Sequence, residues 1–218
     1  MKEKSKILRR IGVNFGQKLL AILAIFIVAI NSPAHAAKWY VDNKLGEVGV
    51  EEKVTPEVPH PVQLLFEFQR NGEFHKGATK QLQPWAIEDL QKSGVFSEVG
   101  TEPREGGAVL RITFNNVVEK QDLDKAKKDG FRAGLGFGLF GGVFATDNYV
   151  VHFEYKRNSE SEPIVTIVEH ALHMKFGKKE VDIDATQVKN VNAAVRMVVS
   201  QAMARGSNNL ASNPAFAD

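Results

Sequence analysis

The sequence predicts an α+β fold: a two-layer sandwich of a mostly antiparallel four- to five-stranded sheet with two helices on one face. Several stretches alternate apolar and polar residues, as half-buried strands do. Two other stretches repeat apolar residues at helical spacing. Because each element is apolar on one side only, the helices should cover the apolar face of the sheet. We predict a single domain over Val62–Arg205.

The composition excludes several classes of chemistry. The 218 residues are 43% apolar and 25% charged, which is typical of a globular protein. The chain contains no cysteine. Disulfides, thiolate metal sites, cysteine nucleophiles and the acylated cysteine of a bacterial lipoprotein are therefore excluded together.

Residues 1–36 have the pattern of a secretory signal peptide. Six basic residues accompany an uninterrupted apolar run, Leu19–Ile30, and Ala34-His35-Ala36 forms a small-x-small cleavage site. The run would span only roughly 18 Å as a helix, against a hydrocarbon layer of ~30 Å. We therefore expect an exported, periplasmic protein that begins near Ala37 and can lie peripherally at a membrane. Retention of the leader as a membrane anchor stays open as the alternative.

The charge of the exported chain argues against a nucleic-acid partner. Without the leader's six basic residues and one acid, 22 Lys and Arg stand against 25 Asp and Glu, a net charge of −3. Nucleic-acid affinity depends on neutralising phosphates with basic side chains. We therefore expect no nucleic-acid partner.

The first half of the domain alternates between strands and one helix. Residues 37–61 end in closely spaced prolines and are expected to form an extended linker. Val62–Phe68 alternates as a strand. A helix should then carry Leu82, Trp85, Ala86 and Leu90 on one stripe, with Pro84 in its first turn and Gly94 as its C-terminal cap. Val95–Val99 follows as a short strand.

The second half predicts three further strands and a helix. Leu110–Phe114 is a strand, and Tyr149–Tyr155 and Ile164–Phe176 form a hairpin. Asp184–Gln187 fits a capping box, which predicts a helix from there to a terminating Gly206. Residues 206–218 are expected to be a flexible tail.

The segment 131–145 is an apolar, glycine-rich insertion with Arg132 as its only charge. Ordinary loops are polar because their backbone is hydrated, so this segment needs a covering surface. We expect it to bind a membrane or a protein partner. The candidate contact residues are Gly134, Leu135, Gly136, Phe137, Gly138, Leu139, Phe140, Gly141, Gly142 and Phe144.

Three conformations of this segment stay open. A helix would place three glycines in a G-x-x-x-G-x-x-x-G row, suited to close helix packing in a membrane, but its interior glycines cost on the order of 5 kcal/mol. A hairpin has arms of about seven residues, shorter than the roughly 9 to 11 that span a bilayer. The third conformation is a turn whose phenylalanines fold back on the domain itself.

Other motifs in the sequence do not fit their usual context. Gly136–Gly141 matches G-x-G-x-x-G, but no strand precedes it and no helix follows. The acidic run from Asp122 lacks the glycine and glutamate of a calcium loop. His170 and His173 are three apart on a predicted strand, so they should point to opposite sides and bind no metal together. We predict no cofactor and no metal site.

The pattern of elements resembles that of small bacterial envelope accessory proteins. It is carried by Gly77–Val99 with "DLQKSGVFSEV", the glycine-rich segment, and "TDNYVVHFEYK". Relatives of that group include the lipopolysaccharide-transport and curli-secretion lipoproteins. The resemblance implies a non-catalytic module that binds an envelope protein or membrane lipid, here without the lipidated cysteine.

The function predicted from the sequence is that of a non-catalytic envelope accessory or assembly factor, with self-association as one use of the apolar segment. Two alternatives stay open. One is a periplasmic hydrolase with a dispersed active site, and the other is a pore-forming oligomer.

Overall fold

The computed structural model describes residues 37–103, 107–117, 142–177 and 182–217. Its strands are β1 (Lys38–Asp42), β2 (His60–Arg70), β3 (Glu73–Phe74), β4 (Phe96–Gly100), β5 (Ala108–Val117), β6 (Gly142–Lys156), β7 (Ile164–Gly177) and β8 (Ala185–Val188). Its helices are α2 (Lys76–Ser93), α4 (Val191–Ala211) and the short α5 (Pro214–Ala217).

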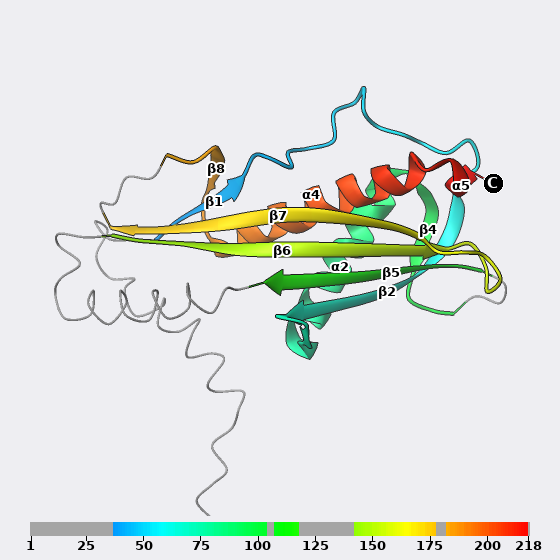
Figure 1. The fold of residues 1–218 in the computed structure, drawn as a ribbon, viewed down its shortest axis with the longest axis horizontal. Coiled ribbons are helices and arrows are strands. Elements are labelled where there is room, and N and C mark those ends of the chain that lie inside the picture. The colour runs from blue at the N-terminus through cyan, green and yellow to red at the C-terminus, as the bar shows by residue number, and fades with distance from the viewer. Residues whose placement is uncertain (1–36, 104–106, 118–141, 178–181, 218) are drawn as a thin grey trace, which may run out of the picture. The chain divides into compact units, whose positions relative to one another are not determined.

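Within this described part, eight strands form one mixed sheet (Figure 1). The strand order is β3-β2-β5-β6-β7-β1-β8, with β4 also paired to β2. β2 runs parallel to β4 and β5, and the successive pairs from β5 to β8 are antiparallel. The α+β class is confirmed, whereas the prediction of four to five strands is wrong.

Helices α2 and α4 pack against one face of this sheet, as predicted (Figure 1). The core lies between the two layers, because alternate residues of each strand turn their apolar side chains toward the helices. The largest fully buried side chains of this core include Leu64, Leu90, Leu110, Ile112, Phe114, Phe153, Tyr155 and Met203.

Residues 37–61 differ from the expected extended linker. Lys38–Asp42 forms β1 between β7 and β8, and its Val41 is completely buried. Farther along, the Val54 N–H donates to Asn208 Oδ1 over 2.7 Å, and Glu52 pairs with Arg205 at 2.8 Å. The closely spaced prolines lie beyond β1 and do not prevent it from pairing.

The start of each main helix also differs from the prediction. The imidazole Nδ1 of His75 accepts the N–H of Ala78 over 3.0 Å, so α2 begins at Lys76 and Pro84 lies in its interior rather than in its first turn. The expected capping box at Asp184–Gln187 is wrong, because Ala185–Val188 pairs with β1 as β8. Asn190 caps α4 instead, accepting the N–H of Ala193 over 2.9 Å.

The end of the chain is ordered helix rather than the expected flexible tail. α4 continues through Gly206 to Ala211. Phe216 of α5 is 5% exposed, and its ring centroid lies 4.7 Å from that of Tyr155. The side chain of Arg157 also donates to the Phe216 carbonyl. These contacts dock the C-terminal residues on the core.

The predicted hairpin is confirmed as β6 and β7, and it is longer than expected. β6 begins at Gly142, and Gly142–Ala145 pairs with Met174–Gly177 of β7. The last residues of the predicted glycine-rich insertion are therefore part of the sheet. Residues 134–141 lie outside the described residues, as do the G-x-G-x-x-G match and the acidic run from Asp122.

Candidate functional site

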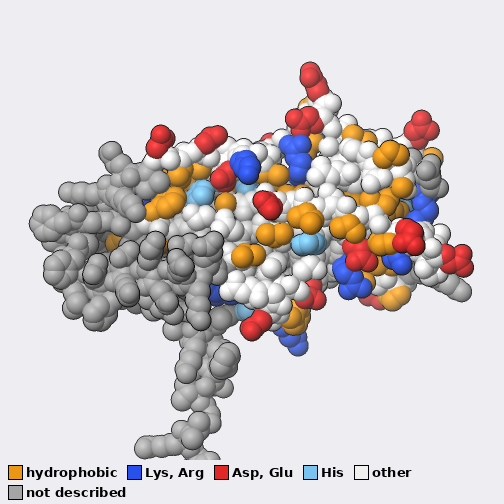
Figure 2. All heavy atoms as spheres, viewed as in Figure 1, with side chains coloured by type: hydrophobic (Ala, Val, Ile, Leu, Met, Phe, Trp, Pro, Cys, Tyr) orange, Lys and Arg blue, Asp and Glu red, His pale blue; other side chains and the backbone are white. Residues whose placement is uncertain are grey.

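The candidate site is the face of the sheet opposite α2 and α4, which we call the open face. In the described residues no helix covers it, and Figure 2 views it from the front. Hydrophobic side chains on this face are interspersed with histidine and charged groups (Figure 2). From β2 to β7 it consists of Leu65, Glu67, Val109, Arg111, Thr113, Val150, His152, Glu154, Val165, Ile167 and Glu169.

Two apolar side chains on the open face are unusually exposed. Val165 is 56% exposed and Ile167 is 51% exposed, and both belong to β7. Strand residues two apart lie on the same face, so these side chains are neighbours. Together they form the most water-exposed apolar part of the open face.

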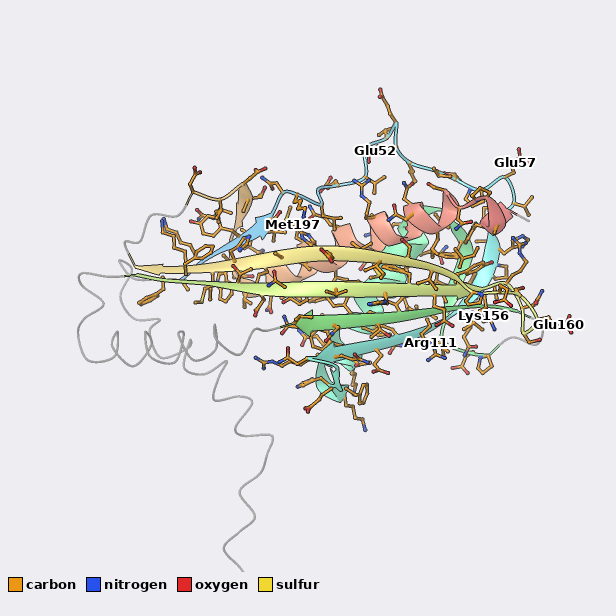
Figure 3. The ribbon with its side chains drawn as sticks, in the orientation of Figure 1. Glu52, Glu57, Arg111, Lys156, Glu160 and Met197 are labelled. Carbon is orange, nitrogen blue, oxygen red and sulfur yellow. The ribbon has the colours of Figure 1, made fainter. Side chains whose placement is uncertain are left out.

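Charged groups on the open face are arranged across neighbouring strands. Arg111 of β5 lies directly opposite Glu154 of β6, an arrangement that favours attraction. Arg111 also lines a cleft of about 260 Å³ together with Leu65 and Glu67. Arg111 and Lys156 lie toward the same end of the sheet (Figure 3). The open face therefore offers apolar contact and charge of both signs.

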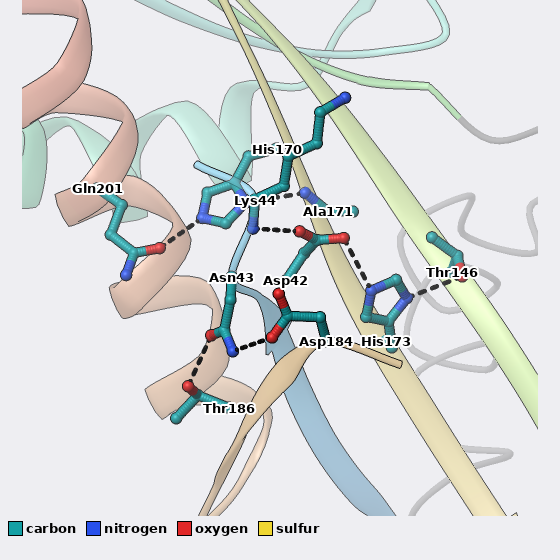
Figure 4. A network of polar contacts seen from close by, with 10 residues as sticks. All are labelled: Asp42, Asn43, Lys44, Thr146, His170, Ala171, His173, Asp184, Thr186 and Gln201. Carbon is teal, nitrogen blue, oxygen red and sulfur yellow. Dashed lines mark hydrogen bonds and ion pairs between the residues drawn. The ribbon is translucent and has the colours of Figure 1, made fainter. Parts of the chain in front are cut away.

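A polar cluster of Thr146, His173 and Asp42 lies toward the other end of the open face (Figure 4). His173 of β7 has its Nδ1 2.9 Å from Thr146 Oγ1 on β6 and its Nε2 3.5 Å from Asp42 Oδ2 on β1. The ring of Phe144 stacks on this imidazole with centroids 5.5 Å apart. Asp42 also accepts the Lys44 N–H. The cluster connects three strands through one side chain.

The Thr146–His173–Asp42 chain has the order hydroxyl, imidazole, carboxylate that hydrolases use. Its setting favours a structural role. His173 is only 8% exposed, its ring is stacked on Phe144, and each of its nitrogens contacts a neighbouring strand. We interpret the Thr146–His173–Asp42 contacts as a structural link that holds β1 against the β6–β7 hairpin. Among the described residues, no group of three or more His, Asp or Glu is arranged to bind a metal.

His170 points to the opposite face, as predicted for histidines three apart on a strand. Its Nδ1 accepts the Ala171 N–H over 2.9 Å, so the proton of the neutral ring is on Nε2, 2.7 Å from Gln201 Oε1 of α4. Burial beneath α4 lowers the pKa of this imidazole below its ordinary value of 6.5. His170 is therefore a neutral core residue.

The lowered pKa of His170 predicts a loss of stability in mild acid. Below about pH 6.5 the unfolded chain binds this proton more readily than the folded chain, so the free energy of unfolding should fall as the pH drops from 7 to 5. The partly buried Asp147 carboxyl, whose pKa is raised by desolvation, acts in the opposite direction. The test is chemical denaturation of the wild type and a His170→Gln variant at both pH values. The variant should lose less stability, and an equal loss in both proteins would contradict the prediction.

A larger hollow of about 730 Å³ lies on the helical side. Trp85, Asn190, Arg196 and Gln201 are among its lining residues. Arg196 is already engaged there: both of its terminal nitrogens contact the Asp89 carboxylate, and its guanidinium carbon lies 5.7 Å above the Trp85 ring. This arrangement holds α2 and α4 together.

Of the contact residues predicted from the sequence, the structure describes Gly142 and Phe144. Both lie in β6, and Phe144 shares the open face with His173 and with Lys175, its partner across the strands. The others, Gly134–Gly141, lie outside the described residues. The described helices contain no stretch with the length and apolar character needed to cross a bilayer.

Comparisons with known proteins show only a distant likeness of fold. No protein-family model matches the sequence, and no curated protein matches it. A PelC variant dodecamer from Paraburkholderia phytofirmans is 13% identical, over 71% of this chain and 90% of that one, with a TM-score of 0.35. A second PelC dodecamer from the same organism is 13% identical, over 73% of this chain and 94% of that one, with a TM-score of 0.28.

A third solved structure, an uncharacterized protein, is 12% identical, over 76% of this chain and 94% of that one, with a TM-score of 0.29. All three TM-scores are below 0.5. Likenesses this weak carry no argument about this chain, so its function has to be argued from its own residues.

Proposed function

We propose that the protein is a non-catalytic accessory or assembly factor of the bacterial cell envelope. It binds a protein partner or a membrane through Gly134–Phe144 and the open face that this segment joins. The observation that carries the proposal is the face of the sheet that none of the described helices covers, on which Val165 and Ile167 stay half exposed. Contiguous exposed apolar side chains mark interaction sites in soluble domains.

The place where the glycine-rich segment joins the sheet supports this assignment. Residues 118–141 connect β5 to β6. Val117, the last residue of β5, pairs with Asn148, so the residues of β6 before Asn148 extend past the end of β5. Phe144, the described aromatic residue of the segment, lies on the open face. A partner that contacts the segment would therefore be able to contact the open face as well.

Replacing both Phe137 and Phe140 with serine tests the proposal. The exported double variant should leave the membrane fraction, or elute as a smaller complex, because two large apolar side chains are lost from the contact. Phe74→Ser is the matched control, since Phe74 is 59% exposed on β3 and is not part of the segment. If the fractionation and size of the double variant equal those of the wild type, the proposal is wrong.

Two further measurements separate the kinds of contact. Alkaline carbonate strips a peripheral protein from membranes but leaves an inserted one. Dye release from liposomes tests the pore-forming alternative, because simple docking on a bilayer releases no dye.

A further inference from the structure

The outer edge of β7 is paired over less than half of its length. β1 lies beside Leu172–Lys175 only. Along Ile164–Ala171, β6 lies on one side, and within the described residues no strand lies on the other. An unpaired edge presents a row of N–H and C=O groups to any chain that can pair with them.

The first five residues of this edge contain none of the usual protection. Ile164–Val168 reads Ile-Val-Thr-Ile-Val, five β-branched residues without a charge, glycine or proline. Natural edge strands are commonly protected by lysine, proline or a β-bulge, and β-branched residues favour strand pairing. The register of β6 with β7 is continuous along this run. It has the composition of a strand that is paired on both sides.

The backbone of this edge faces outward at alternate residues. Where β1 ends, the N–H of Ala171 donates to the imidazole of its neighbour His170 instead of to a strand. In an antiparallel sheet, residues two apart direct their backbone groups to the same side. Val165, Ile167 and Glu169 therefore present their N–H and C=O groups on the unpaired edge.

We propose that this edge pairs with the same edge of a second copy of the chain, antiparallel, about a two-fold axis at Thr166. The pairing places Val165 opposite the partner's Ile167, so that the two most exposed apolar side chains of the open face cover each other. Glu169 then lies opposite the partner's Pro163, which accepts a hydrogen bond without needing to donate one. No like charges face each other within this register.

The second copy suits this edge better than a foreign strand does. The run carries no charge that would select a different partner, and a two-fold axis makes an uncharged, β-branched run complementary to itself. This inference deepens the proposed function by naming one partner of the envelope factor. It uses Val165 and Ile167 at the edge of the open face and no residue of the glycine-rich segment.

A single cysteine tests the axis directly, because the chain has no cysteine of its own. On a two-fold axis Thr166 lies opposite the partner's Thr166 at a non-hydrogen-bonded position, where the Cα atoms are about 4.5 Å apart. A disulfide spans that distance. Mild oxidation of the Thr166→Cys variant of the exported chain should give a covalent dimer. His152→Cys, an exposed control on β6, should stay mainly monomeric on denaturing gels.

Sedimentation equilibrium of variants without cysteine gives a second readout. Ile167→Lys should weaken the dimer at least tenfold, whereas His152→Lys, directly opposite Ile167 on β6, should not. The Phe137→Ser, Phe140→Ser double variant should remain dimeric, so the two proposals fail separately. A wild type that is monomeric at high concentration, or a Thr166→Cys variant that oxidation does not join, would overturn the inference.

Discussion

Replacing Gly206 with alanine is expected to destabilise the protein by about 1–3 kcal/mol, the cost of overpacking a core. A Cβ at this position would lie 2.2 Å from Phe153 Cζ and within 2.6 Å of two more atoms of the same ring. Phe153 is completely buried, so the ring cannot move aside into solvent. Replacing glycine with alanine inside a helix normally stabilises a protein by roughly 0.5–1 kcal/mol. A loss of stability here would therefore indicate that the added Cβ collides with Phe153.

Urea unfolding of the Gly206→Ala variant measures this cost. Gly100→Ala is the matched control, because nothing lies within 4 Å of a Cβ placed there. Combining Gly206→Ala with Phe153→Leu should recover part of the loss, since the smaller side chain makes room for the added methyl group. A Gly206→Ala variant as stable as the wild type would show that α4 does not approach β6 so closely.

Replacing Arg196 with methionine should cost about 2 kcal/mol, because it leaves a buried carboxylate without its partner. Asp89 is 7% exposed, and both of its oxygens contact Arg196, one of them at 2.7 Å. The Asp89 carboxylate holds the pKa of Arg196 above its ordinary value. Since the arginine side chain is itself 29% exposed, we expect a smaller cost than for a fully buried pair.

The neighbouring ion pair provides the control for Arg196. Lys92 and Glu88 contact each other on the same helix, but their side chains are 66% and 50% exposed. Lys92→Met should therefore leave the denaturation midpoint unchanged. A double variant, Asp89→Leu with Arg196→Met, should regain most of the lost stability, because it removes the uncompensated charge as well. Equal effects of Arg196→Met and Lys92→Met would contradict this explanation.

The strands that the sequence predicted correctly are those whose burial is visible in their own residues. β2, β5, β6 and β7 alternate because one side of each packs on the helices. β1 and β8 could not be predicted in the same way. They are short, and they pair with each other across a long stretch of sequence. Asn43 and Asp184, which are hydrogen-bonded beside the paired residues, are 141 residues apart.

Two of the three helix boundaries that differ from the prediction do so for local reasons. His75 caps α2 with a ring nitrogen, and histidine is not among the usual capping residues. Gly206 looked like a helix end, although its role is to let α4 approach Phe153. The structure is needed to separate a glycine that ends a helix from one that permits close packing.

The contact role predicted for residues 131–145 stays a prediction, because most of these residues lie outside the described part of the chain. The composition of residues 131–145 pointed to a contact surface, and Phe144 does lie on the open face. The open face itself was missed, because the alternation that reveals a buried side does not say whether anything covers the other side. The available signal was Ile-Val-Thr-Ile-Val, whose outward residues Val165 and Ile167 are apolar where a solvated strand face would be polar.

Site-specific photo-crosslinking of the exported protein in bacteria tests the proposed contact surface most directly. A photoreactive side chain is placed in turn at Phe140 in the predicted segment, at His152 on the open face, and at the exposed Lys80 on the outside of α2. Crosslinked products with protein or lipid are expected from Phe140 and His152 and not from Lys80. Products from Lys80 alone, or none from Phe140 and His152, would contradict binding through this side of the molecule.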